Sequence, residues 1–543
     1  MKRFKLFLAM AALACAIGLT VKYGSTYRPV VEPVREIEEI WALEDAREES
    51  EEPLVTRLFC NGIPMAYDAE NNVFYGSLGL ENGAQWPEIK LTASEETAKG
   101  LSLCFADDYG FDDCDAAIRE GYSYQIFAYT DTAYSYAEVV FTGLPLVNVT
   151  ADQTIEREDV PAQIEIALAA EGLQTNGRIH KRGGASILND KVGYKLEFTR
   201  TTDGKKKIYR EIPGMGTDNQ VILLPMNALD TTMMRDRLSW ALYARLTRRD
   251  EPFSARKTQY CELFLNGEYR GVYLMLEPFS VRQEVAKAGE ERLTTDSVYR
   301  TAVISLSHGR PCMEDPYSAA TGFELYYPMD GEPDFSPLAD YFALLGETDD
   351  AAFMQRAAQI IDLDSALRYD VVLQLFGLTD NVINNMYTWA QNSRGHTRYR
   401  FDFWDLDVSW GLKRDEIGEM HENWVFFPLV DRLLRADEEG GVRKRYGEIY
   451  REVREKAFDA ETVEALVGQY AHELNDSGAM ARNAERWETE NYAADGYELV
   501  AFAAERIALL DEPVRAMSAG EEIDLRFLEK TNYDDKGTPL SEE

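Results

Sequence analysis

Acidic and amide side chains recur at short intervals between Asp380 and Gly411, and these residue types could carry chemistry. Asp380 and Asn385 are five residues apart and lie among mainly apolar neighbours. The aromatic-rich segment that follows carries three more acids, namely Asp402, Asp405 and Asp407. Burying several carboxylates costs free energy unless a cation or a shared proton compensates their charge. A divalent metal is the simplest compensation.

The order of these residues also suggests a reaction. An Asp that accepts a hydroxyl proton, an Asn a few residues later and an Asp on a following strand are the elements of metal-assisted phosphoryl transfer in kinases. Asp380, Asn385 and Asp405 occur in that order. A structural interpretation stays open for each residue taken singly, in which Asp380 caps a turn, Asn385 hydrogen-bonds to the backbone, and Asp405 or Asp407 pairs with Arg400 or Lys413.

A basic, glycine-rich turn lies upstream of this stretch. Gly183 and Gly184 allow the backbone to approach a ligand closely, and the residues around them supply positive charge. These cations are His180 when protonated, Lys181, Arg182, Lys191 and Lys195. A phosphate could lie there, although a hairpin on a solvated face has the same pattern.

A hairpin is predicted between Tyr260 and Glu277. Asn266-Gly267 has alternating apolar residues on both sides, which is the strongest short-range signal for a β-hairpin. Glu277 ends the second strand, where the chain leaves the sheet toward Pro278. A ligand could meet exposed backbone at that point.

The elements that position these residues need more than one core. The chain has 543 residues, so we expect two or three domains of roughly 100 to 200 residues. Residues 54–143 alternate apolar and polar residues between turns, which predicts a small antiparallel β domain resembling a sandwich. Residues 144–415 alternate strands with helical stretches such as Asp230–Arg245 and Asp364–Leu378, and residues 416–518 have helical periodicity. The sequence therefore predicts an α+β fold.

The two ends of the chain predict export and a polar tail. Within residues 1–22 a basic start precedes the uncharged run Leu6–Val21, as in a secretory signal. Ala14-Cys15-Ala16 offers a cleavage site, yet the run is only slightly shorter than a spanning helix of about 20 residues, so cleavage and anchoring both stay open. We expect an extracytoplasmic protein, secreted or membrane-anchored. Residues 23–53 predict an acidic, solvated linker, and 519–543 an acidic disordered tail.

Charge and cysteine content exclude several classes of protein. Lys and Arg number 57 against 95 Asp and Glu, and the net charge of -38 repels nucleic acid. The absence of a Cys-x-x-Cys pair argues against a structural zinc site. Cys104 and Cys114 either close a disulfide in an oxidising compartment or remain buried free thiols. The acids between Phe105 and Ala116 lack the spacing of a calcium loop, which favours a solvated turn.

Five motifs in this order resemble the CotH family, the spore coat protein H proteins regarded as atypical protein kinases. The resemblance covers approximately residues 164–411. The motifs are Arg182-Gly-Gly-Ala-Ser with Lys191-x-x-Tyr194, Asp230 with Arg235, Asn266-Gly-x-Tyr-x-Gly-Val-Tyr with Glu277, Asp380-x-x-x-x-Asn385, and Trp404-Asp-Leu-Asp with Gly411.

The resemblance implies a kinase-like fold that binds ATP and Mg²⁺ or Mn²⁺ and phosphorylates Ser or Thr of protein partners. Asp380 would be the catalytic base, Asn385 and Asp405 would hold metal, and Asp407 would be a second metal ligand or a structural partner of the loop. The cofactor-binding residues implied are Arg182, Lys191 or Lys195 on the phosphates, and Glu277 near the purine.

The basic turn departs from the family pattern, since Gly184 replaces a residue that is more often polar. Two rival functions stay open. One is a surface-attached binding or scaffold protein that retains a kinase-like fold without turnover. The other is a metal-dependent hydrolase, for which His396 and His421 are the only histidines nearby. The complete set of Asp380, Asn385 and Asp405 favours the kinase.

Overall fold

The computed structural model describes residues 30–32, 36–81, 83–84, 89–94, 100–106, 113–183, 185–226, 230–247, 255–302, 322–328, 334–412, 424–425 and 427–521. The export segment 1–22, Asp107 to Asp112, Cys312, Lys413 and His421 lie outside these ranges. In the described part of the chain, no helix combines the length and the apolar character needed to cross a membrane. Sheets and helices both contribute to the fold, so the predicted α+β class is confirmed.

The N-terminal region contains two sheets that share a core. The larger has the order β1-β8-β9-β10-β6-β5, with β2 beside β10, and the smaller has the order β4-β3-β7. Phe74, Leu91 and Val139 from both sheets meet in one apolar cluster. The strands and the helix between them are β1 (Val31–Glu32), β2 (Glu48–Glu49), β3 (Leu58–Cys60), β4 (Ile63–Pro64), β5 (Ala66–Asp68), β6 (Val73–Ser77), β7 (Leu91–Ala93), β8 (Ser102–Phe105), α3 (Cys114–Arg119), β9 (Ser123–Tyr129) and β10 (Ala133–Thr142).

The larger sheet is mixed, which corrects the prediction of a purely antiparallel domain. Strand β10 pairs antiparallel with β9 but parallel with β6 and β2, and β1 pairs parallel with β8. Parallel neighbours need a long connection, and the chain between β6 and β10 contains three strands and α3. Alternation of residue types predicts strands but does not reveal which strands are neighbours.

Part of the acidic segment 23–53 differs from the solvated linker that was predicted. Helix α2 (Ile37–Asp45) forms there, and Ile40 is fully buried in a cluster that includes Phe127. Leu43 packs against the same cluster, because residues three apart share one face of a helix. The four described cysteines are buried free thiols, namely Cys60, Cys104, Cys114 and Cys261.

A closed barrel follows, with the order β11-β12-β13-β14-β17-β19-β18. Tyr194, Leu196 and Phe198 of β14 point into its core, as their alternation predicts. Asn266 and Gly267 have positive φ angles of 54° and 78° and join β18 to β19 in the predicted hairpin. The strands are β11 (Leu146–Thr150), β12 (Val160–Leu168), β13 (Glu171–Arg182), β14 (Gly193–Thr199), β17 (Gln220–Leu224), β18 (Thr258–Leu265) and β19 (Glu268–Leu276), and the small ribbon β15 (Arg210–Ile212) and β16 (Gly216–Asp218) lies beside them.

The second half of the chain is a four-stranded sheet surrounded by helices. Its order is β21-β20-β22-β23, and Tyr369 of α8 stacks on Phe403 of β23 with ring centroids 4.1 Å apart. The elements are α4 (Arg235–Ala244), α5 (Val281–Lys287), β20 (Ser297–Ala302), β21 (Phe323–Tyr327), α6 (Ala339–Leu345), α7 (Asp350–Ile360), α8 (Leu363–Phe376), α9 (Asp380–Ile383), β22 (Asn384–Ser393) and β23 (His396–Phe403).

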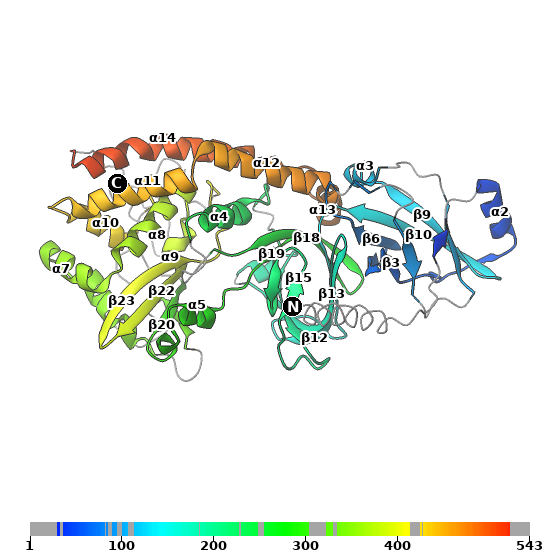
Figure 1. Cartoon of the computed structure of the whole chain (residues 1–543), viewed down its shortest axis with the longest axis horizontal. Helices are drawn as coiled ribbons and strands as arrows, with labels where there is room; N and C mark the ends of the chain where they lie inside the picture. Colours follow the sequence, from blue (N-terminus) through cyan, green and yellow to red (C-terminus); the bar gives the residue numbers. More distant parts are fainter. Residues whose placement is uncertain are drawn as a thin grey trace, which may run out of the picture.

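The C-terminal helices lie along one side of the molecule and reach from this sheet to the barrel (Figure 1). They are α10 (Pro428–Arg435), α11 (Gly441–Lys456), α12 (Ala460–Asp476), α13 (Ala479–Trp487) and α14 (Tyr497–Ala519). Phe502 of α14 lies against both Gly377 and Gly411, which bracket the candidate catalytic stretch. Arg506 of α14 donates to the Gln374 carbonyl of α8. The last long helix therefore supports the segment that carries Asp380.

A buried ion pair joins the barrel to α13 and the N-terminal sheet. Arg482 of α13 binds the fully buried Glu262 of β18 at 2.8 Å, and Tyr269 donates to the same carboxylate at 2.7 Å. The Arg482 guanidinium also lies 5.8 Å from the ring centroid of Tyr75 on β6. One cationic side chain thus contacts three parts of the fold.

Candidate active site

Two segments meet at Asp380. Helix α8 ends at Gly377 in the left-handed conformation, and Asp380 begins the short helix α9. The Asp380 carboxylate accepts hydrogen bonds from the side chains of Asn385, at 2.8 Å, and Asn384, at 3.1 Å. The Trp404 amide donates to the Asn385 carbonyl at 3.0 Å. The five-residue spacing therefore brings Asp380 and Asn385 into contact and sets both beside the segment that carries Asp405.

Four carboxylates interact here, and we call Asp236, Asp380, Asp405 and Asp407 the acid cluster. Burial raises the pKa of Asp407 well above its usual range, and the charges of Asp405, Asp236 and Asp380 raise it further. Burial and the charge of Asp405 raise the pKa of Asp236 to about 7, against a hydrogen bond from the Leu406 amide that lowers it. Within the described residues, one Asp236 carboxyl oxygen is buried without a hydrogen-bond partner. The cluster thus brings together carboxyl groups whose negative charges repel one another.

Asp236 is the site residue that the sequence analysis missed. It lies in the first turn of α4, where an acidic residue is ordinary. It also precedes the buried Trp240 by four residues and the buried Tyr243 by seven. Residues at those spacings share one helix face, so Asp236 stands on the buried face. That position was the signal that could have identified it.

Arg182 connects the barrel to this site. Its guanidinium, at the end of β13, lies 5.8 Å from the centroid of the Trp404 ring, and Trp404 directly precedes Asp405. Phe279 stacks on Tyr387 at 4.5 Å and lies 6.2 Å from Trp404. An arginine from the barrel and the ring of Phe279 thus lie close to Trp404, the residue before Asp405.

The other predicted cofactor-binding residues have partners elsewhere. Lys191 Nζ donates to the Val272 carbonyl at 2.6 Å and to Asn483 at 3.0 Å, and burial lowers the pKa of Lys191 to about 7. Lys195 pairs with Glu197 at 3.1 Å.

Glu277 accepts a hydrogen bond from the Lys257 amide at 3.1 Å. In the described residues, the contacts of Lys191, Lys195 and Glu277 given above do not reach the acid cluster. Arg400, a suggested partner of Asp405 or Asp407, lies 3.6 Å from Asp362, and the other suggested partner, Lys413, lies outside the described residues.

The residues of the site suit a divalent metal by their chemistry. Mg²⁺ prefers oxygen ligands, which carboxylates and an Asn carbonyl supply, and one buried oxygen of Asp236 accepts no hydrogen bond within the described residues. Nevertheless, no three His, Cys, Asp or Glu side chains of the described residues are gathered as a metal would require. The donor set fits, while its present spacing does not enclose an ion.

The comparison with known families agrees with this geometry. A family model described as CotH kinase protein matches residues 179–510, which is more than half of the chain. The matched segment begins near the end of β13, includes the acid cluster and ends within α14. No curated protein gives a match. The predicted resemblance is confirmed, and the chain belongs to the CotH kinase protein family.

Proposed function

We propose that this chain is a kinase-like phosphotransferase that moves the terminal phosphoryl group of ATP to a Ser or Thr hydroxyl of a protein. The barrel and the β20–β23 sheet with its helices would be the two lobes of a kinase-like core, with the acid cluster between them. The observation that carries the proposal is the hydrogen bond from Asn385 to Asp380 beside Asp405. Family membership supports the kinase-like activity in general terms.

In the proposed reaction the acceptor hydroxyl gives its proton to Asp380 as its oxygen bonds to the γ-phosphorus of ATP. The bond from that phosphorus to the bridging oxygen breaks, and ADP leaves with the electron pair. The hydrogen bond that Asn385 donates at 2.8 Å orients the Asp380 carboxylate for its proposed role as general base. Asn385, Asp405 and Asp407 would hold Mg²⁺ or Mn²⁺, which when bound would neutralise charge on the phosphates.

Positive charge for the nucleotide would come from Arg182, which contacts the ring of Trp404, the residue before Asp405. This reassigns the phosphate contact from Lys191, which is held by Val272 and Asn483. The basic start and apolar run at the N-terminus support an extracytoplasmic location, secreted or anchored, for both enzyme and protein substrate.

The test is transfer of labelled phosphate from ATP in the presence of Mg²⁺ or Mn²⁺. Asp380→Asn should reduce the rate by about 10²-fold or more, the usual value of a positioned general base. Asp405→Asn should be equally inactive, and the exposed Asp131→Asn serves as the matched control. Wild-type protein that neither transfers phosphate nor binds ATP would rule out the proposal.

A scaffold without turnover is the second candidate, and one observation favours it. Lys191 and Lys195 are both engaged by protein partners, so in the described residues Arg182, through its contact with Trp404, is the one predicted phosphate contact that reaches the segment carrying Asp405. Binding of ATP without transfer, unchanged in Asp380→Asn, would identify the scaffold.

A further inference from the structure

A cavity of about 230 Å³ opens at the edge strand β23. The end of α4, the first turns of α8 and the paired strands β22 and β23 form its walls. Its volume is below the roughly 300 to 1,000 Å³ of sites for drug-sized ligands, so it suits one small group. No step of the proposed phosphotransfer uses these walls.

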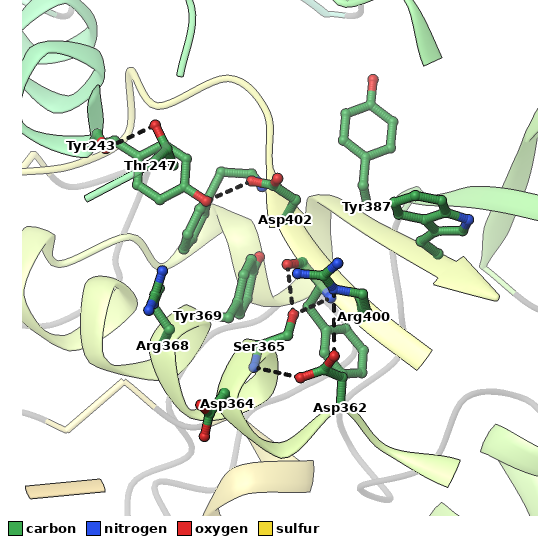
Figure 2. Close-up of a pocket in the computed structure, with 13 residues that line it drawn as sticks. Tyr243, Thr247, Asp362, Asp364, Ser365, Arg368, Tyr369, Tyr387, Arg400 and Asp402 are labelled. Atoms are coloured by element: carbon green, nitrogen blue, oxygen red, sulfur yellow. Dashed lines mark hydrogen bonds and ion pairs between the residues drawn. The ribbon is translucent and has the colours of Figure 1, made fainter. Parts of the chain in front are cut away.

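Two arginines face this cavity, and neither makes a hydrogen bond with another described residue. Arg368 and Arg400 lie on either side of the Tyr369 ring in Figure 2. The nearest acid to Arg368 is Glu452 at 4.0 Å, and the nearest to Arg400 is Asp362 at 3.6 Å. Both distances exceed those of charge-assisted hydrogen bonds. In the described residues, neither guanidinium donates a hydrogen bond, which is unexpected in a chain with a net charge of -38.

The two surface acids of the cavity are already engaged by other groups. Arg445 binds both carboxylate oxygens of Asp364, at 2.8 and 2.7 Å. Asp362 caps α8 by accepting the Ser365 amide at 3.2 Å. The amides at the start of this 14-residue helix add positive potential near the cavity. The positive charge of the two arginines is therefore only weakly compensated.

A buried acid completes the lining. The Asp402 side chain is 6% exposed, and its Oδ1 accepts hydrogen bonds from the Tyr243 hydroxyl at 2.9 Å and the Phe403 amide at 2.7 Å. Its Oδ2 forms no hydrogen bond within the described residues. Burial raises the pKa of Asp402 to about 7, so the carboxyl is partly protonated near neutral pH and can donate through this oxygen.

We propose that this cavity binds a phosphate group, either as the free ion or as a monoester on a side chain. Two guanidinium forks that approach from different sides need an anion with at least three acceptor oxygens, and a phosphate has them. A carboxylate has two oxygens and satisfies one fork. The carboxylic acid of Asp402 supplies a further donor for a phosphate oxygen.

The site adjoins the acid cluster but is separate from it. Tyr369 lines the cavity, and its hydroxyl donates to the Asn381 carbonyl at 2.6 Å, one residue after Asp380. The proposal does not rest on phosphoryl transfer, because binding needs neither ATP nor a metal. Asp380→Asn should therefore bind phosphate ligands as the wild type does.

The test is calorimetric titration of the full chain with O-phosphoserine, inorganic phosphate and glutamate. Replacing both arginines (Arg368→Gln with Arg400→Gln) should weaken binding of the phosphate ligands by about tenfold or more, because each charge-assisted hydrogen bond contributes roughly that factor or more. Arg398→Gln, on the same strand but outside the cavity lining, should bind normally. Tighter binding of phosphoserine than of inorganic phosphate identifies a protein-borne ligand, and equal binding identifies the free ion.

A second measurement uses the wild type and avoids any folding defect of the variants. Phenylglyoxal modifies accessible arginines, and mass spectrometry locates the adducts. Phosphoserine should slow modification of Arg368 and Arg400 but not of Arg398. The proposal is overturned if glutamate binds as tightly as the phosphate ligands, if the double variant binds like Arg398→Gln, or if the protected arginines lie elsewhere.

Discussion

Replacing Asp236 by Asn should stabilise the protein at alkaline pH. Asp236 is 5% exposed, and burial together with the charge of Asp405 raises its pKa to about 7. The folded chain therefore keeps a proton that the unfolded chain has already released at the same pH. Asparagine resembles the protonated carboxyl in shape and carries no charge, so it removes the electrostatic cost.

The size of the effect follows from the pKa. A rise from 3.8 to about 7 corresponds to a cost on the order of 4 kcal/mol above pH 7, where Asp236 is ionised in both states. Well below pH 4 both states are protonated and the cost disappears. The free energy of unfolding of the variant should thus exceed that of the wild type by about half a kcal/mol at pH 4, about 1 to 2 kcal/mol at pH 5 and about 4 kcal/mol at pH 8.

Urea denaturation at these three pH values, with EDTA present, measures the difference. The matched control is Asp131→Asn, which removes an acid from an exposed position and should leave the free energy of unfolding unchanged at every pH. Adding Mg²⁺ should reduce the gain at pH 8, because a bound cation would offset the same repulsion in the wild type.

A constant difference between Asp236→Asn and the wild type across this pH range would contradict the reasoning. So would a variant that is less stable at pH 8. Either result would mean that the Asp236 carboxylate has a compensating partner in solution and that the acid cluster carries less repulsion than its burial implies.

Three further predictions concern the fold. Arg482→Met should lower the free energy of unfolding, measured by urea denaturation, by about 3 to 5 kcal/mol because it leaves Glu262 charged and buried. Adding Glu262→Gln should restore part of the loss. An Arg482→Met variant as stable as the wild type would contradict this prediction. The four described cysteines should react with a thiol reagent only after unfolding, and mass spectrometry should then find all four modified without reductant. A pair of them left unmodified would indicate a disulfide. Gly377→Ala should lower the thermal stability of the protein more than Gly395→Ala does. Both glycines have positive φ, but only at Gly377 would a Cβ lie 2.8 Å from the Phe502 ring of α14. Equal losses of thermal stability would refute this contact.

The sequence predicted local features well because short-range rules determine them. Asn266-Gly267 predicts its hairpin because both residues tolerate positive φ. Asp380 and Asn385 are so close in sequence that their contact depends little on the rest of the fold. The α+β class and the family follow from periodicity and from motifs of this kind.

What the sequence could not show depends on contacts between distant segments. The parallel pairing of β10 with β6 requires knowledge of which strands are neighbours. Lys191 looked like a phosphate ligand because of its glycine neighbours, yet its partner Asn483 lies far along the chain on α13. Asp236 joined the acid cluster only because α4 is buried on the side that faces Leu406. Each outcome was decided by tertiary packing.

The packing of α14 has a consequence for biosynthesis. Phe502 fills the space between Gly377 and Gly411, and Arg506 holds the end of α8, so the turn at Asp380 lacks its support until both residues have been made and have packed. An incomplete chain that already contains every acid of the cluster would still lack a formed site. The proposed activity should therefore require the complete α14, and premature termination before Phe502 should give an inert product rather than a partly active one.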